Sequence, residues 1–253
     1  MIKASVVVLA IVAAVVAAPA SDSVELTGEA VLDVNGTGPD GKGNTADDTW
    51  QFWFETVVPR GKFLHLDLCT QKMTADQREK GIYDAKAKRG KGKVQGPIAD
   101  KLPNPKETEG WIFHSDWDGR FEGVWADKKT KKVILYPYVE KGQHRCVAIS
   151  YTVPKAGTYA LSGGMSDLHV WKHEKHDGIF WQIATSADAG KSVKVVAKGG
   201  PFGDEVAPAS TKIDVKDIKL AAGELLFIIV DPGKWWGSDM ASLDDIKITR
   251  TGD

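Results

Sequence analysis

Two adjacent tryptophans form the clearest ligand-binding candidate in this sequence. Trp235 and Trp236 stand in the glycine-flanked segment 233–239, where two neighbouring rings cannot both point into one core. An exposed indole offers a flat apolar surface to the C–H face of a sugar ring, and Asp239 can bind the hydroxyls of that sugar. The segment is therefore a candidate sugar platform. The alternative is that both rings cover an edge of the fold.

A histidine-rich segment is the second candidate. Within nine residues it holds His169, Trp171, His173, His176 and Asp177. Neutral imidazoles bind zinc, copper or nickel, and a carboxylate can complete the shell. However, the neighbouring lysines repel a cation, and the spacing matches no strict metal motif. We interpret the segment as a polar loop at the rim of the fold, where the histidines and Trp171 contact a ligand.

An aspartate- and glycine-rich segment, 33–48, is a candidate cation site. It offers carboxylate and carbonyl oxygens, which are the ligands that calcium prefers. The segment is not an EF-hand, because the fixed spacing and the closing glutamate are missing. We expect a structural Ca²⁺ here, and the alternative is a turn without an ion. The candidate ligands are Asp33, Asn35, Asp40, Asp47 and Asp48.

Catalysis has one candidate region, the segment 114–122. Its acidic residues and histidine are Asp116, Asp118, Glu122 and His114. Paired carboxylates can hydrolyse a glycosidic bond when they lie about 5 to 9 Å apart. A histidine with a tyrosine such as Tyr136 or Tyr138 can supply a lyase with a base and an acid. The alternative is ordinary solvated turn chemistry.

No motif for an organic cofactor is present. The sequence lacks a Gly-x-Ser-x-Gly elbow, a phosphate loop, a dinucleotide fingerprint and the Cys/His spacing of a zinc site.

The first 20 residues have the pattern of a secretory signal. Lys3 precedes an apolar stretch, 6–17, which ends at Ala18-Pro19-Ala20. This stretch is shorter than the roughly 20 residues that a membrane span needs. We expect cleavage after Ala20 and a mature chain that is secreted or held in the periplasm or cell envelope, without a membrane span. The alternative is an uncleaved anchor.

The composition narrows the possible partners. Lys and Arg number 33 and Asp and Glu number 34, which argues against nucleic acid or an anionic membrane as partner. Nine tryptophans make an aromatic ligand platform worth testing. The basic run 86–93 can bind an acidic polysaccharide or form a solvated loop. Oligomeric state is not indicated.

Two cysteines, Cys69 and Cys146, are the only ones in the chain. An oxidising compartment permits them to form a disulfide. The alternative is two buried thiols, because cysteine is often a small core residue.

The elements that must position these residues are strands. From Trp111 onward, short apolar runs alternate with turns at intervals of about ten residues, which is typical of a sandwich or barrel. Alternation places Ile179, Trp181 and Ile183 on one face, and a run that is apolar on both faces, 225–230, indicates a central strand. We expect a hairpin over 111–126 around Asp118-Gly119, and then sequentially paired antiparallel strands at 133–139, 145–153, 158–162, 179–185, 192–197, 213–220, 224–230 and 243–250.

The N-terminal third is less regular. We expect strands at 24–34, 49–57 and 62–68, followed by an excursion from the sandwich over about 70–110. A capping-box pattern from Thr74 to Gln77, with Gly81 as the closing residue, predicts a short helix in that excursion.

The C-terminal half resembles a known family. In the segment 144–163 a strand ends at Pro154, an Ala-Gly turn follows, and the next strand ends in Ser-Gly. The segments 176–183, 220–232 and 238–248 continue the pattern. These features resemble the secreted bacterial jelly-roll modules of the galactose-binding-like, carbohydrate-binding kind, over about residues 144–250. The resemblance implies a jelly roll that binds glycans. A structural Ca²⁺ is frequent in these modules, so the resemblance also favours one here.

These observations predict an all-β protein in which residues 21–253 form a single antiparallel jelly-roll sandwich. The predicted function is non-catalytic binding of a polysaccharide or glycan. One alternative is a polysaccharide hydrolase or lyase that acts through the 114–122 hairpin, and another is a structural cell-envelope protein. The predicted ligand residues are Trp235, Trp236, Asp239, Trp171, His173 and His176.

Overall fold

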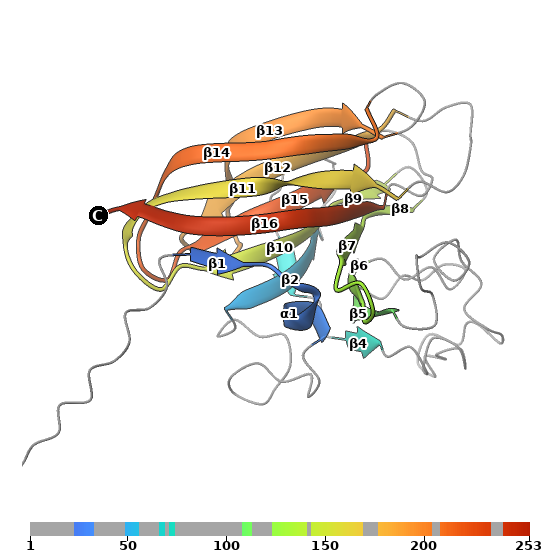
Figure 1. Cartoon of the computed structure of the whole chain (residues 1–253), viewed down its shortest axis with the longest axis horizontal. Coiled ribbons are helices and arrows are strands. Elements are labelled where there is room, and N and C mark those ends of the chain that lie inside the picture. The colour runs from blue at the N-terminus through green and yellow to red at the C-terminus, as the bar shows by residue number, and fades with distance from the viewer. Residues whose placement is uncertain are drawn as a thin grey trace, which may run out of the picture.

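Two facing antiparallel β-sheets contain most of the residues that the structure describes (Figure 1). The computed structural model describes residues 23–32, 49–55, 66–68, 71–73, 108–112, 123–140, 143–168, 177–203, 208–233 and 240–253. The predicted all-β sandwich is therefore confirmed. In this part of the chain, no helix is both long and apolar enough to cross a membrane.

The first sheet is built from β1 (Ser23–Glu25), β4 (Gln71–Met73), β5 (Thr108–Ile112), β6 (Gly123–Asp127), β7 (Val133–Tyr136), β11 (Gly157–Asp167), β14 (Ser210–Leu220) and β16 (Ala241–Gly252). The second sheet is built from β2 (Trp50–Glu55), β3 (Leu66–Leu68), β10 (Val147–Thr152), β12 (Ile179–Ser186), β13 (Lys194–Phe202) and β15 (Leu225–Asp231). A separate pair, β8 (Tyr138–Glu140) and β9 (Gln143–Arg145), and the helix α1 (Gly28–Leu32) complete the described elements.

Eight of these strands follow the jelly-roll order. The first sheet contains the run β14-β11-β16-β7 and the second the run β13-β12-β15-β10. Along the chain, the path from β7 to β16 changes sheet at every step between these eight strands except the β12–β13 hairpin. This is the double-sheet arrangement of a jelly roll. The predicted sequential pairing is wrong for this half of the chain, because most consecutive strands face each other across the core.

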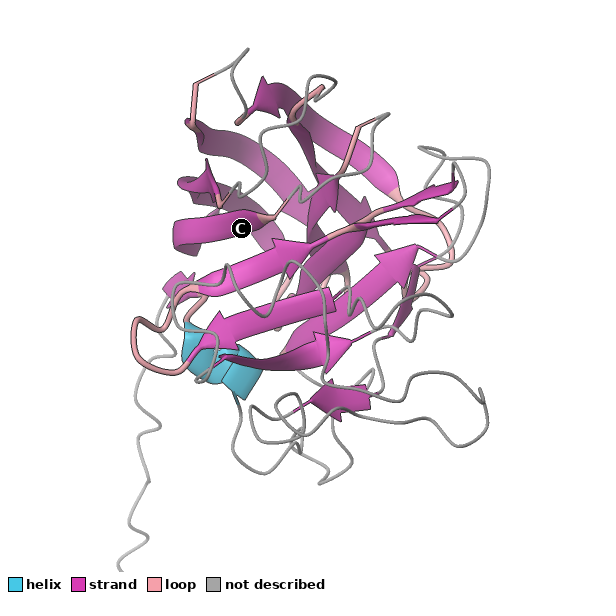
Figure 2. Cartoon of the chain, turned by 90° about the vertical axis from the view of Figure 1, so that its right-hand side faces the viewer, coloured by secondary structure: helices cyan, strands magenta, loops and turns pink. Residues whose placement is uncertain are grey.

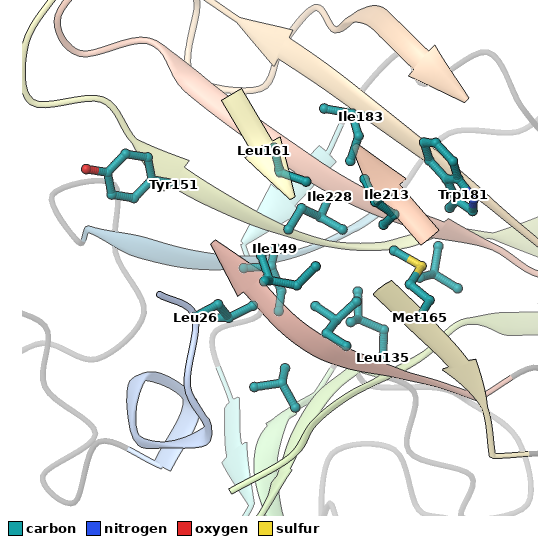
Figure 3. Packing of buried hydrophobic residues seen from close by; sticks show 14 of the residues in the cluster. Leu26, Leu135, Ile149, Tyr151, Leu161, Met165, Trp181, Ile183, Ile213 and Ile228 are labelled. Carbon is teal, nitrogen blue, oxygen red and sulfur yellow. The ribbon is translucent and has the colours of Figure 1, made fainter. Parts of the chain in front are cut away.

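The strand β15 lies at the centre of the second sheet, between β12 and β10, and every one of its residues is buried. Leu226 and Ile228 point into the main core, which Figure 3 shows from close by. The same core receives Ile179, Trp181 and Ile183 from β12, so the predicted shared face of these three residues is confirmed. The prediction of a central strand in 225–230 is also confirmed.

The outer face of β15 is apolar as well. Phe227 meets the ring of Trp53 edge-on, with 5.5 Å between the ring centroids. The indole nitrogen of Trp53 donates a hydrogen bond to Ser150 Oγ at 2.8 Å. Cys146 and Ile229 belong to the same buried cluster. Burial on both faces explains why this strand has an unbroken apolar sequence.

The predicted strand 24–34 is wrong beyond its first residues, since α1 follows β1 there. Gly28 donates its N–H to the carbonyl of Lys131 at 2.9 Å, and a Cβ on Gly28 would lie 2.5 Å from that oxygen. This close approach brings the short helix against the β6–β7 turn. Leu26 and Val31 are buried there and close one side of the core.

Two other predictions of the sequence need correction. The predicted strand 133–139 divides at Pro137 into β7 and β8, because proline has no N–H to donate to a ladder. The predicted excursion 70–110 includes β4 and the start of β5, both of which pair in the first sheet. The predicted helix and the basic run 86–93 lie outside the described residues.

The two ends of the jelly roll differ in their connections. At the end that we call the turn end, the short segments 153–156, 187–193 and 221–224 join consecutive strands. The other connections between these strands lie at the opposite end, which faces the viewer in Figure 2. We call it the loop end, and its described residues include Asp167, Leu168, Asp177, Gly178, Phe202, Gly203, Asp231, Pro232, Gly233 and Met240.

The turn between β12 and β13 is organised by the carboxylate of Asp188. Its Oδ2 accepts the hydroxyl of Ser192 at 2.6 Å, and its Oδ1 accepts the Ser192 N–H and the Ser186 hydroxyl, both at 2.8 Å. The hydrogen bonds from Ser192, followed by that from Ser186, lower the pKa of Asp188 to about 2.

This turn should make stability depend on pH. A carboxyl group whose folded pKa is lowered stabilises the fold above its unfolded pKa, and that stabilisation disappears as the pH falls through the folded value. We expect Asp188→Asn to lower Tm at pH 7, and the difference from the unmodified protein to shrink between about pH 4 and pH 2. Thermal unfolding across this range measures it, with Asp245→Asn at an exposed position as the control. A difference that stays constant with pH would contradict the assignment.

Candidate functional site

Asp177 and Tyr136 are described, but the other candidate side chains from the sequence analysis lie outside the described residues, and so does Cys69. They comprise the ligand residues Trp171, His173, His176, Trp235, Trp236 and Asp239, the catalytic candidates His114, Asp116, Asp118 and Glu122, and the cation ligands Asp33, Asn35, Asp40, Asp47 and Asp48. The structure does describe the residues that flank each of these segments. Those residues show at which end of the sandwich each segment begins and finishes.

Both predicted ligand segments are anchored at the loop end. Leu168, which precedes the histidine-rich segment, donates its N–H to the carbonyl of Met240 at 2.9 Å. Met240 is the residue that follows the tryptophan segment. On the other side, Asp177 follows the histidine-rich segment and lies against Gly233, which precedes the tryptophans. The two segments therefore share both of their anchoring regions.

The residues that flank the candidate catalytic segment also lie near the loop end. Ile112 and Gly123 flank it and pair with each other between β5 and β6. Gly123 also pairs with Tyr136, and the neighbouring Leu135 pairs with Ala241 at the start of β16. The backbone of Tyr136 is thus close to the residue that follows Glu122. Tyr138, the other tyrosine considered for a lyase, begins β8 in the separate two-stranded sheet.

The predicted cation segment rejoins the sandwich at the turn end. Thr49, the first described residue after it, accepts the N–H of Thr152 at 2.8 Å, and Trp50 pairs with Tyr151. The described residue that follows this segment therefore lies at the opposite end from the residues that flank the two ligand segments. Among the residues that the structure describes, no group of three His, Cys, Asp or Glu side chains could hold a metal ion.

The predicted disulfide is not tested. Cys146 is buried in the outer apolar cluster beside β15. Leu68, which precedes Cys69, pairs with Trp53 on β2, and Trp53 in turn pairs with Ala148 on β10. The strand β2 therefore lies between the strands next to the two cysteines. Because Cys69 is outside the described residues, the bond stays a prediction.

Two aspartates at the loop end rest directly on glycines. A Cβ on Gly203 would lie 2.6 Å from Oδ2 of Asp167, and a Cβ on Gly233 would lie 2.7 Å from both carboxylate oxygens of Asp177. Both glycines have positive φ angles, +78° and +69°. Only glycine tolerates this combination of backbone conformation and close contact. The contacts join β11 to β13 and β12 to β15.

A third carboxylate stiffens the end of β15. Asp231 is buried, and its Oδ1 accepts the N–H of Gly233 at 3.0 Å. At the loop end, the carboxylates of Asp167, Asp177 and Asp231 therefore each lie against a glycine. The sequence does not indicate these contacts. An aspartate or a glycine beside an apolar strand is visible in it, but the residue that it contacts belongs to a strand distant in the sequence, and only the arrangement of the strands shows which one.

No protein family model matches this sequence, and no curated protein is similar to it. Several solved structures overlap with part of the fold. A family 61 carbohydrate-binding module in complex with β-1,4-galactotriose is 17% identical, with 47% of this chain and 70% of that chain covered and a TM-score of 0.30. A family 32 carbohydrate-binding module from a family 31 glycoside hydrolase of Clostridium perfringens is 14% identical, with 48% and 76% covered and a TM-score of 0.30.

A pentameric capsid protein from metagenomic phage sequences also overlaps, at 17% identity, with 41% of this chain and 56% of that chain covered and a TM-score of 0.26. Because these TM-scores are all below 0.5, neither the ligands nor the functions of these proteins are carried over to this chain.

The contact between Asp167 and Gly203 should have a measurable energy. Gly223 at the turn end has a similar φ of +83°, but nothing lies within 4 Å of its Cβ position. Gly223→Ala should therefore cost only the backbone strain, about 1–2 kcal/mol. Gly203→Ala must in addition displace the carboxylate, so we expect it to cost at least about 1 kcal/mol more. Urea unfolding of both variants measures the difference, and equal losses would contradict the contact.

Proposed function

We propose that this protein is a secreted, non-catalytic carbohydrate-binding sandwich whose glycan site lies at the loop end. One observation carries the proposal. The segments that hold Trp171 and the Trp235–Trp236 pair start and finish at the same place, through the Leu168–Met240 hydrogen bond and the Asp177–Gly233 contact. Tryptophans that are far apart in the sequence are in this way attached to one small region.

Chain length supports this arrangement. An extended chain spans at most about 3.3–3.6 Å per residue. Trp171 is three residues from Leu168, and Trp235 is two residues from Gly233. Their Cα atoms therefore lie within about 11 Å and about 7 Å of those anchors. Aromatic rings combined with a few fixed polar groups are what a sugar site needs, and His173, His176 and Asp239 are the polar candidates.

The sequence resemblance over about 144–250 also supports the proposal, because the jelly-roll order covers that part of the chain. The ligand in this proposal is a polysaccharide or other glycan, bound without an organic cofactor.

Export is a further part of the proposal. We expect the first 20 residues to be removed, so that the mature chain begins at Ser21, two residues before β1. Intact-mass measurement of the secreted protein tests this expectation, and a mass that includes residues 1–20 would contradict it. The structural Ca²⁺ in segment 33–48 is a separate proposal, which predicts that EDTA lowers Tm.

The test of glycan binding compares the unmodified protein with the Trp235→Ala/Trp236→Ala double variant. Affinity gels that contain a panel of polysaccharides identify a ligand, and titration calorimetry then measures Kd. Truncation of a central tryptophan commonly costs about 2 kcal/mol or more, so we expect a loss of at least about 10-fold. Trp50→Phe at the turn end is the control and should bind as the unmodified protein does.

Other outcomes would decide against the proposal. If the affinity gels retain the double variant as well as the unmodified protein, the two tryptophans are not part of the glycan site. If they do not retain the unmodified protein, glycan binding is contradicted. New reducing ends or unsaturated uronates would favour a hydrolase or lyase that acts through segment 114–122. Self-association without glycan affinity would favour a structural cell-envelope protein.

A further inference from the structure

The strand β13 ends the second sheet and pairs with only one neighbour, β12. It is the uppermost strand in Figure 1. An edge strand presents backbone N–H and C=O groups along its open side, where a further strand can pair with them. Lys194, Val195, Val196 and Lys198 are all exposed, so this part of the edge is open to solvent.

Two adjacent valines distinguish this edge. Val195 and Val196 have exposed fractions of 39% and 41%, and among the described residues they are the only large hydrophobic side chains that are exposed. The strand β14, which ends the first sheet, exposes none. An edge that only has to stay soluble gains nothing from exposed valines, because apolar groups on an open edge favour pairing. The valines therefore point to a partner that adds a strand.

The charges beside the valines restrict the partner. The strand β13 contains two lysines, Lys194 and Lys198, and no acidic residue. Within the part of the chain that the structure describes, neither lysine has a carboxylate partner. The strand β14 instead carries three lysines and two aspartates, and Nζ of Lys216 lies 3.4 Å from Oδ2 of Asp214. The positive charge of β13 is therefore uncompensated along its open edge.

A second copy of β13 fits this edge poorly. In an antiparallel pair centred on Val196, Lys194 of each strand would stand opposite Lys198 of the other, and like charges in this position destabilise a pair. Val196 is also an extra residue in the ladder between β13 and β12. Such a bulge twists an edge strand and hinders the long, flat pairing of identical edges. A short strand with carboxylates replaces the repulsion by attraction.

We propose that residues 194–198 of β13 are a docking strand for a short, extended, acidic segment of a partner protein. Backbone hydrogen bonds along the open edge hold the segment, and Val195 and Val196 pack against its apolar side chains. Its carboxylates pair with Lys194 and Lys198 across the strands. The lysines thereby favour an acidic strand and reject a copy of β13. The inference goes beyond the proposed function and is independent of glycan binding.

Titration of the mature protein with two blocked peptides, followed by backbone amide NMR, tests the proposal. In the first peptide glutamates flank two central valines, and in the second lysines replace the glutamates. The glutamate peptide should shift the amides of residues 194–198 and bind at least about fivefold more tightly than the lysine peptide, because opposite charges across strands attract and like charges repel. This preference should shrink as the salt concentration rises.

Reversal of the charges sharpens the comparison. Lys194→Glu/Lys198→Glu should reverse the preference, so that the lysine peptide binds at least about fivefold more tightly. Lys212→Glu/Lys219→Glu makes the same change of charge at exposed positions of β14 and is the matched control. It should keep the preference of the unmodified protein. Because all four positions are exposed, Tm should change by only a few degrees in either variant.

Other outcomes would overturn the proposal. If the unmodified protein binds neither peptide, or binds both equally, the edge does not select an acidic strand. Shift changes on β14 instead of residues 194–198 would place the docking strand wrongly. If sedimentation equilibrium shows self-association that Lys194→Glu/Lys198→Glu abolishes, a second copy occupies the edge instead. Failure of glycan binding in the affinity gels would leave each of these results unaffected.

Discussion

The burial of β15 on both faces is the constraint on which the rest of the fold depends. Its inward side chains meet β12 and the first sheet in the main core, and its outward side chains form a second cluster with β2 and β10. A slip of one residue would exchange the side chains that β15 places in the two clusters, and it would disrupt the close packing on both faces. The last residue of β15, Asp231, and the two residues that follow it, up to Gly233, therefore provide a fixed base at one end of the sandwich.

The crossing pattern of the jelly roll then separates the two ends. Consecutive strands of the path run in opposite directions, so the connections between them alternate between the turn end and the loop end (Figure 1). Asp188 organises a compact turn at the first end. Asp167 and Asp177 instead tie strand ends together at the second. Precise positioning of a ligand site is easier from such fixed strand ends than from unsupported loops.

Much of the fold follows from local patterns in the sequence. The inward face of β12 is correctly predicted from the alternation at Ile179, Trp181 and Ile183, and the central strand from the apolar run 225–230. Both predictions succeed because buried positions carry apolar residues. Pairing was harder to predict. The helix at Gly28 depends on close contact with Lys131, about a hundred residues away, and no local pattern contains that information.

The candidate site shows the same limit. Residue types indicated which segments could bind sugar, hold calcium or perform catalysis, and those side chains lie outside the described residues. The sequence does not show which candidate segments have their flanking residues at the same end of the sandwich. That information comes from the order of the strands in the two sheets and from contacts between distant residues, such as that of Asp177 with Gly233.

Backbone amide NMR of the mature protein during titration with the retained oligosaccharide tests the proposed glycan site most directly. A site at the loop end predicts chemical-shift changes at Asp167, Asp177, Gly203 and Gly233, with Asp188 and Gly223 unchanged. Shift changes confined to the turn end or to the middle of a sheet would contradict a glycan site at the loop end.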